Sequence, residues 1–277
     1  MNYYCYIAGM PDLQIDNPKS VPTLQNIIDD VTPLLSYWDL RAFTLLRNRY
    51  DNDNLLLFLK DKDADLNPLG TLSSKDWQEI IAIIDESNEL NPAKDKRILP
   101  YVLEFYTHYK KEKSTIVFPQ EYLSSLYYEY GIKCNNSFIS NWFTFNLNVN
   151  NILTALTCKK YNWEIKSALV GNNNVVDTIK TNQNAKDFNL KTEVDYIDKI
   201  INISDTTNLL DKERKIDLLK WEWLENNSFY KDFSVEKIFA FWLKAELMHR
   251  WDNLSQEHGS EIFRSMINDL KKDVKFK

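Results

Sequence analysis

The chain has 277 residues and a mass of 32.8 kDa, and 44% of its residues are hydrophobic and 27% are charged. This length and composition exclude both a disordered chain and a small scaffold held together by disulfides. Its formal net charge of -6 and pI near 5.3 argue against a nucleic-acid partner, because phosphate binding needs a basic face. Five glycines are too few for the tight turns of a hairpin-rich β fold, so an all-α fold is favoured.

Targeting and redox signals point to the cytoplasm. Residues 1–9 carry neither the basic region nor the apolar core of a signal peptide, and no window reaches the roughly 18 apolar residues that span a bilayer. The cysteines, Cys5, Cys134 and Cys158, are odd in number and form no CxxC pair, which suits a reducing compartment. We expect a cytoplasmic protein that reaches a membrane only through a partner.

Apolar side chains recur at helical spacing in four segments of the N-terminal half, while residues 1–22 give no assignment. The predicted helices cover about 31–45, 73–84, 98–111 and 119–131. Ser73 and Asp76 match a capping box at the start of the second helix. Pro119 suits the first turn of the fourth helix, and Gly131 suits its C-cap.

The longest regular pattern predicts a central helix with a buried seam of about five turns. Its apolar residues alternate steps of four and three: Phe138, Trp142, Phe145, Val149, Ile152 and Leu156. The Asn-rich run that starts at Gly171, and the polar stretch up to Leu190, predict a connection between two halves.

These patterns predict an all-α, elongated, layered multi-helix bundle. N-terminal helical layers would cover residues 1–170, a polar connection 171–190, and a C-terminal layer 191–277, or one continuous domain would cover the whole chain. The C-terminal layer should hold helices near 194–201 and 216–223, a third that opens at Ser234, and a closing helix from Gly259 followed by a basic tail.

Motifs for chemistry are missing from the sequence. It has no glycine cluster for phosphates, no G-x-S-x-G elbow and no H-E-x-x-H pair, so we expect no catalytic, cofactor-binding or metal-binding residues. His249 and His258 with Glu246 and Glu257 are the alternative, a metal site in a helical hydrolase. Their spacing matches no recurring ligand pattern, and a polar helix end is the simpler reading.

Three tryptophans are the candidate partner contacts: Trp221, Trp242 and Trp251. Residues two apart on a helix point to different faces, so Trp221 and Trp223 cannot both join one narrow core stripe. We assign Trp223 to the core. Trp221 then either packs against a neighbouring layer or anchors a partner, since Trp is enriched in binding hot spots.

The central helix resembles a motif of the C-type subunit of V/A-type ATPases, which is the d-type subunit in the eukaryotic V-ATPase. The family motif, Asp-x-x-Asn-Leu followed by Leu, a basic residue and Gly, is matched in order by Asn148, Asn151, Ile152, Leu156 and Lys159, with Asn162 near the Gly. Asn148 replaces the acid. Residues 51–55 (Asp-Asn-Asp-Asn-Leu) fit the first part without substitution and 252–254 echo it, which suggests a helical unit used more than once.

The C-terminal stretch also resembles that family in the order of its aromatic, acidic and glycine positions. The matching residues are Phe241, Trp242, Glu246, Gly259, Glu261 and Ile262. The chain departs from the family's Asn-Leu-Arg segment, where it has Leu247 to Trp251. The chain as a whole, including its start from Tyr3 to Leu13, is similar to an uncharacterised DUF2764-like family found among V-type ATPase subunits of Bacteroidetes, and this resemblance covers most of the length.

The resemblance implies a non-catalytic component that links the central stalk to the membrane rotor ring in proton or sodium transport. Such a protein would bind no cofactor and would lie in the cytoplasm, peripheral to the inner membrane. Its partners would be the central-stalk proteins and the rotor ring, with ATP driving transport or being synthesised. The alternative is a helical scaffold or adaptor with an unrelated partner.

Overall fold

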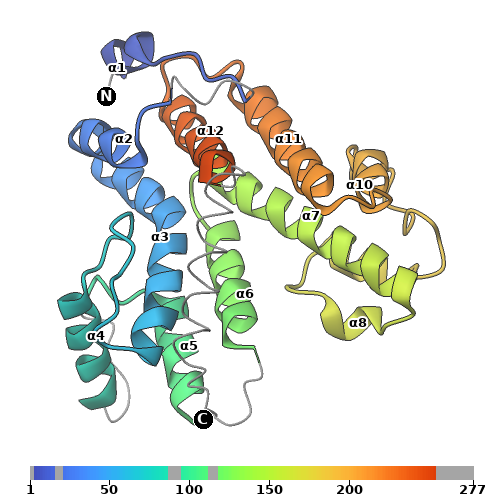
Figure 1. Ribbon diagram of the computed structural model, residues 1–277, viewed down its shortest axis with the longest axis horizontal. Helices are drawn as coiled ribbons and strands as arrows, with labels where there is room; N and C mark the ends of the chain where they lie inside the picture. The colour runs from blue at the N-terminus through green and yellow to red at the C-terminus, as the bar shows by residue number, and fades with distance from the viewer. Residues whose placement is uncertain (1–2, 16–20, 87–94, 112–117, 254–277) are drawn as a thin grey trace, which may run out of the picture. The chain divides into compact units, whose positions relative to one another are not determined.

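The computed structural model describes residues 3–15, 21–86, 95–111 and 118–253, and within these residues it forms α-helices and no strand (Figure 1). The predicted all-α fold is confirmed. The helices are α1 (Tyr4–Gly9), α2 (Leu24–Val31), α3 (Tyr37–Lys60), α4 (Ser74–Glu86), α5 (Pro100–Lys111), α6 (Pro119–Ile132), α7 (Ser137–Tyr161), α8 (Ile165–Ala168), α9 (Asn174–Thr181), α10 (Ile197–Ser204), α11 (Leu209–Ser228) and α12 (Val235–Asn253).

The chain divides into two compact units. The first unit joins both parts of the chain that flank the second, Met1–Ser36 and Asp217–Lys277, and the second unit is the continuous segment Tyr37–Ile216. The connection predicted at 171–190 lies inside the second unit, where it contains α9 with Val175, Val176 and Ile179 buried. The closing helix predicted from Gly259, and the basic tail, lie outside the described residues.

The second unit is built on α3, α5, α6 and α7. Helix α6 packs against α3, α5 and α7, and α3, α5 and α6 run side by side (Figure 1). Two buried tyrosines tie the helices together: the Tyr127 hydroxyl donates to the Leu45 carbonyl at 2.7 Å, and the Tyr101 hydroxyl donates to Asn52 Oδ1 at 2.8 Å. These hydrogen bonds give the buried tyrosine hydroxyls a partner, and without one their burial would reduce the stability of the fold.

Gly131 has a different role from the predicted C-cap. Helix α6 continues to Ile132 and is capped by Lys133, so Gly131 lies within the helix and is buried. A Cβ atom at this position would overlap the ring of Phe143 in α7. Glycine is therefore needed for the close approach of α6 and α7, while Pro119 occupies the first turn as predicted.

Helix α7 confirms the predicted central helix. The Asn136 side chain caps its start by accepting from the Ile139 N–H at 3.1 Å, and the helix ends at Asn162 in the left-handed conformation with φ 57°. Four of the six seam residues are buried, while Trp142 and Leu156 are half-buried. The helix also buries three asparagines, Asn146, Asn148 and Asn151, which the apolar pattern does not predict.

In the first unit, α2 packs against α12. Helix α2 buries Ile27, Ile28 and Val31 on one face. Helix α12 is buried over most of its circumference, because residues 238–243 are all apolar and together cover every side of the helix. The apolar face of α2 and the core of α12 thus form the hydrophobic centre of this unit.

The helix predicted over 31–45 is wrong in its continuity. Helix α2 ends at Val31, a short 3-10 turn covers Thr32–Leu34, and α3 begins at Tyr37. Pro33 lacks the N–H that a continuing helix would need, and Leu35 is extended with ψ 141°. Trp38, counted in the predicted apolar stripe, is instead 67% exposed.

Candidate functional site

The residues 51–55 that match the motif hold a loop against α3. One carboxylate oxygen of Asp51 accepts from the Thr71 N–H at 2.7 Å and the Leu72 N–H at 3.1 Å, and the other accepts from the Thr71 hydroxyl at 2.7 Å. Asn54 accepts from the Asn67 N–H at 2.7 Å and donates to the Asn67 carbonyl at 3.0 Å. We call this arrangement the first loop clamp.

Gly70 lies at the closest point of this clamp. A Cβ atom there would lie 2.6 Å from Asn54 Nδ2 and 2.8 Å from Asp51 Oδ1, so a side chain would push the loop off both residues. The Arg47 guanidinium donates to the carbonyls of Leu69 and Gly70, which fixes the same loop from a preceding turn of α3. The close packing of the loop against α3 therefore requires a residue without a side chain at position 70.

Burial raises the pKa of Asp51 above its ordinary value of 3.8. The hydrogen bonds from Thr71 and Leu72 and the charge of Arg47 lower the pKa, but by less than burial raises it. The carboxylate is thus held by several donors inside a site that disfavours its charge.

A second loop clamp occurs on α7. Asn151 donates to the Val170 carbonyl at 2.8 Å and accepts from the Val170 N–H at 2.9 Å, the same paired contact that Asn54 makes. Asn148, three residues earlier as Asp51 is to Asn54, accepts from the Asn173 side chain at 2.8 Å. Asn173 in turn caps α9 by accepting from the Val176 N–H. Both matches to the motif therefore hold a loop that leads into a following helix.

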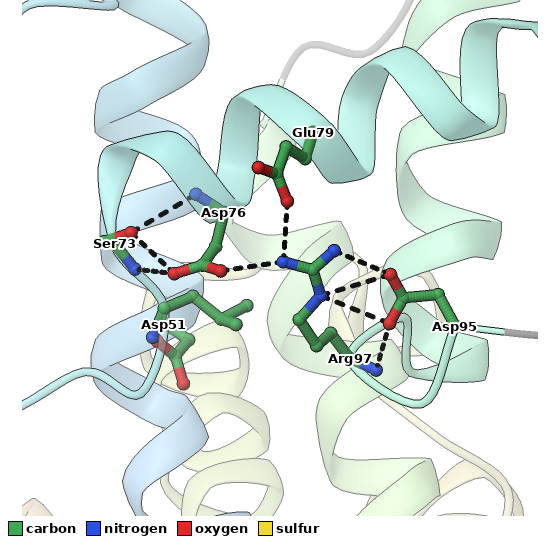
Figure 2. A network of polar contacts seen from close by, with 7 residues as sticks. Asp51, Ser73, Asp76, Glu79, Asp95 and Arg97 are labelled. Carbon is green, nitrogen blue, oxygen red and sulfur yellow. Dashed lines mark hydrogen bonds and ion pairs between the residues drawn. The ribbon is translucent and has the colours of Figure 1, made fainter.

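The start of α4 beyond the first clamp belongs to a charged network (Figure 2). Ser73 and Asp76 form the predicted capping box, with the Ser73 N–H donating to Asp76 at 2.9 Å and the Asp76 N–H donating to Ser73 Oγ at 3.2 Å. Arg97 then donates to Asp76 at 2.7 Å, to Glu79 at 3.0 Å and to both oxygens of Asp95. The hydrogen bonds of Ser73 and the charge of Arg97 lower the pKa of Asp76.

The three candidate tryptophans lie in different environments. Trp242 is fully buried in α12, so its ring belongs to the core. Trp221 is also buried; its Nε1 donates to Glu225 at 3.0 Å, and Lys244 Nζ lies 4.7 Å from its ring centre. Trp223, assigned to the core from the sequence, is half-buried, because α11 turns Trp221 and Leu224 inward instead.

Trp251 belongs to a buried ionic centre that the sequence patterns do not reveal. The side chain of Asp217 is fully buried; it accepts from Arg250 at 2.9 and 3.0 Å, from Trp251 Nε1 at 3.0 Å and from Lys220 at 3.4 Å. Asp217 follows Ile216 at the start of the helix predicted over 216–223, and the apolar spacing of that helix does not mark it as buried. This centre joins α11 to the end of α12 within the first unit.

The alternative metal site is only partly covered by the structure. His249 Nε2 lies 2.9 Å from the Pro22 carbonyl oxygen, and Glu246 is buried in α12. His258 and Glu257 lie outside the described residues. Among the described residues, no group of three or more His, Cys, Asp or Glu side chains could hold a metal ion.

Several aromatic side chains are exposed and offer surfaces for contact. Tyr37 and Trp38 are exposed at the start of α3, with the Arg41 guanidinium 5.6 Å from the Trp38 ring centre. Tyr161 and Trp163 are exposed at the end of α7. Within the described part of the chain, no helix is both long and apolar enough to cross a membrane.

Comparison with known proteins gives one family. The profile of a family described as a protein of unknown function (DUF2764) matches residues 1–274. No curated protein and no solved structure matches the chain.

Proposed function

We propose that this chain, which belongs to the DUF2764 family, is a non-catalytic component of a V/A-type rotary ATPase that resembles its C-type (d-type) subunit. It would link the central stalk to the membrane rotor ring, during ATP-driven or ATP-synthesising transport of protons or sodium ions. Its place would be cytoplasmic, peripheral to the inner membrane, with membrane contact only through the rotor ring.

The repeated loop clamp is the observation that carries this proposal. The residues that match the motif of the C-type family are Asp51 with Asn54 and Asn148 with Asn151. Asn54 and Asn151 make the same pair of hydrogen bonds to a loop backbone, and Asp51 and Asn148 each accept a hydrogen bond from the same loop. A chance sequence echo would not be expected to have the same structural role twice. The motif is therefore part of how two helix–loop–helix units are built.

The end of α7 supports the same comparison. The family motif ends in Gly, and this chain has Asn162 near that place, in the left-handed conformation that Gly adopts most easily and Asn tolerates. Lys159, at the basic position of the motif, donates to the carbonyls of Asn184 and Ala185 at 2.9 and 2.7 Å.

A protein that passes torque must resist deformation. Close-packed helices resist shear because their side chains interdigitate with few voids. The clamps add fixed loops between helices, and the Asp217 centre joins α11 to α12. These features suit a connector that transmits force between two partners.

Affinity purification of the tagged full chain from its native cells, under conditions that preserve membranes, tests the proposal. Recovery of both central-stalk and rotor-ring proteins, identified by mass spectrometry, is the expected result. A tagged, unrelated cytoplasmic protein of similar net charge is the control for non-specific capture. Recovery of a different, reproducible set of proteins would favour the adaptor alternative, and the rotary assignment would then be abandoned.

A further inference from the structure

A basic and aromatic surface lies where α7 ends in the second unit. We call it the α7 tip and define it by Lys159, Lys160, Tyr161, Trp163, Lys166 and Lys186. The chain leaves α7 here and enters α8, which packs against α7. The proposed function uses only Lys159 of this set.

The two aromatic rings of the α7 tip are exposed, and a backbone hydrogen bond fixes the turn that carries them. Tyr161 is 56% and Trp163 63% exposed, and their rings stack with centres 5.2 Å apart. Asn162 between them is left-handed, and the Trp163 N–H donates to the Cys158 carbonyl at 2.8 Å, as in a Schellman motif. An apolar residue at the position of Trp163 usually packs back onto its helix. Here it remains largely in solvent.

The lysines of the α7 tip come from three segments of the chain. Lys160 Nζ lies 5.9 Å from the Tyr161 ring centre. Lys159 holds the carbonyls of Asn184 and Ala185, which brings the exposed Lys186 to this end of the helix. Lys166 is exposed in α8, one turn after Trp163.

The sign of this surface is opposite to that of the chain. The α7 tip contains four lysines, and its segments contain two carboxylates, Glu164 and Asp187, while the whole chain has a net charge of -6. The helix dipole explains Lys159 and Lys160, because cations are favoured at a helix C-terminus. It explains neither the lysines beyond the helix nor the exposed ring pair.

We infer that the α7 tip docks onto an acidic face of a protein partner, with Trp163 as the central anchor. Exposed Trp and Tyr beside cations are typical of binding hot spots, and a basic surface steers an acidic partner into register. The proposed function gives the chain membrane contact only through the rotor ring, so the occupant is a protein and not an anionic lipid surface. The inference rests on the proposed function, so the partner is another protein of the rotary ATPase.

Site-specific crosslinking tests the α7 tip in the full chain. The photoreactive amino acid p-benzoylphenylalanine replaces Trp163 in one variant and Trp38 in a matched variant, because both tryptophans are exposed in the same unit. Cells are irradiated, the tagged chain is purified, and its adducts are identified by mass spectrometry. In parallel, Trp163→Ala, Trp38→Ala and the double change K160E/K166E are compared with the original chain for recovery of ATPase proteins.

The expected result is an adduct between position 163 and one of the ATPase proteins, with none from position 38. Trp163→Ala and K160E/K166E should each reduce recovery of that protein about tenfold or more, with an unchanged melting temperature, and Trp38→Ala should not. Recovery of ATPase proteins by all variants, or a lipid adduct at position 163, overturns the α7 tip and leaves the proposed function standing. If even the original chain recovers no ATPase protein, both proposals fail.

Discussion

Removing either partner of the Asp217–Arg250 pair should destabilise the first unit by unequal amounts. The Asp217 carboxylate is fully buried, whereas the Arg250 side chain is 39% exposed. Arg250→Ala leaves this buried carboxylate with the Lys220 ammonium at 3.4 Å and the Trp251 N–H at 3.0 Å as its remaining donors in this centre. Breaking a buried pair typically costs about 3–5 kcal/mol, and these two donors place the expected loss near the lower end, about 3 kcal/mol.

Asp217→Asn leaves the charge on Arg250, which can hydrate from its exposed side. Asn keeps one acceptor oxygen for these donors, but its NH2 group leaves one of them without an acceptor, so the expected loss is about 1–2 kcal/mol. Thermal unfolding followed by tryptophan fluorescence measures both variants; about 3 kcal/mol corresponds to a fall in Tm of roughly 6–12 °C for a chain of this size. If the units melt separately, only the transition of the first unit should move.

Arg97→Ala is the matched control for this comparison. Arg97 pairs with three carboxylates, Asp76, Glu79 and Asp95, and all three are partly exposed. Solvent screens such pairs, so the shift in Tm should be clearly smaller than for Arg250→Ala. Equal losses from Arg250→Ala and Asp217→Asn, or a larger loss from Arg97→Ala, would refute the reasoning from burial.

Further predictions concern the first loop clamp and the capping box. Gly70→Ala should destabilise the second unit by about 1–3 kcal/mol through overlap with Asp51, while Gly9→Ala, with no atom within 4 Å of its added Cβ, should leave denaturant unfolding nearly unchanged. The raised pKa of Asp51 means that the folded state binds the proton of this carboxyl more tightly than the unfolded state does. The stability that this group contributes therefore falls as pH rises from 3.8 through the folded pKa, and Asp51→Asn should abolish that fall. The lowered pKa of Asp76 has the opposite sign: its stabilisation is present above 3.8 and is lost as pH falls through the folded pKa, so Asp76→Asn should flatten the acid limb.

The pH predictions are measured as the difference in unfolding free energy between the original chain and each variant, in urea titrations across the acid range. Taking differences removes the contribution of the other carboxylates. Opposite slopes for Asp51→Asn and Asp76→Asn are expected, and slopes of the same sign would contradict the assigned causes.

Local signals in the sequence predicted much of the secondary structure. Ser73 with Asp76, and Pro119, mark helix starts because their effects depend on neighbouring backbone groups alone. The seam of α7 was visible because its apolar residues repeat with the period of the helix. The prediction for Gly131 is wrong because a glycine near the end of a helix can either cap it or allow a second helix to approach closely. The contact with Phe143 in α7, which decides between these roles, cannot be read from the local sequence.

The candidate site was less accessible to sequence reasoning. The clamping asparagines and Asp217 are buried polar residues, and an apolar pattern assigns polar residues to the surface. Trp221 and Trp223 were separated correctly onto two faces, but which face is inner depends on the direction in which α11 meets its neighbours. The family resemblance points to Asp51 and Asn148 in the sequence, but their role in holding a loop is seen only from their hydrogen bonds.

The first unit combines residues from both ends of the described chain, with the second unit between them. During synthesis, residues 37–216 emerge complete and can fold while the later helices are still missing, because domains fold as units from the N-terminal side. The side chains of α2 that pack against α12 must wait for more than 200 further residues to be made. A chaperone or an early-bound partner that covers α2 during this interval would protect the nascent protein from aggregation.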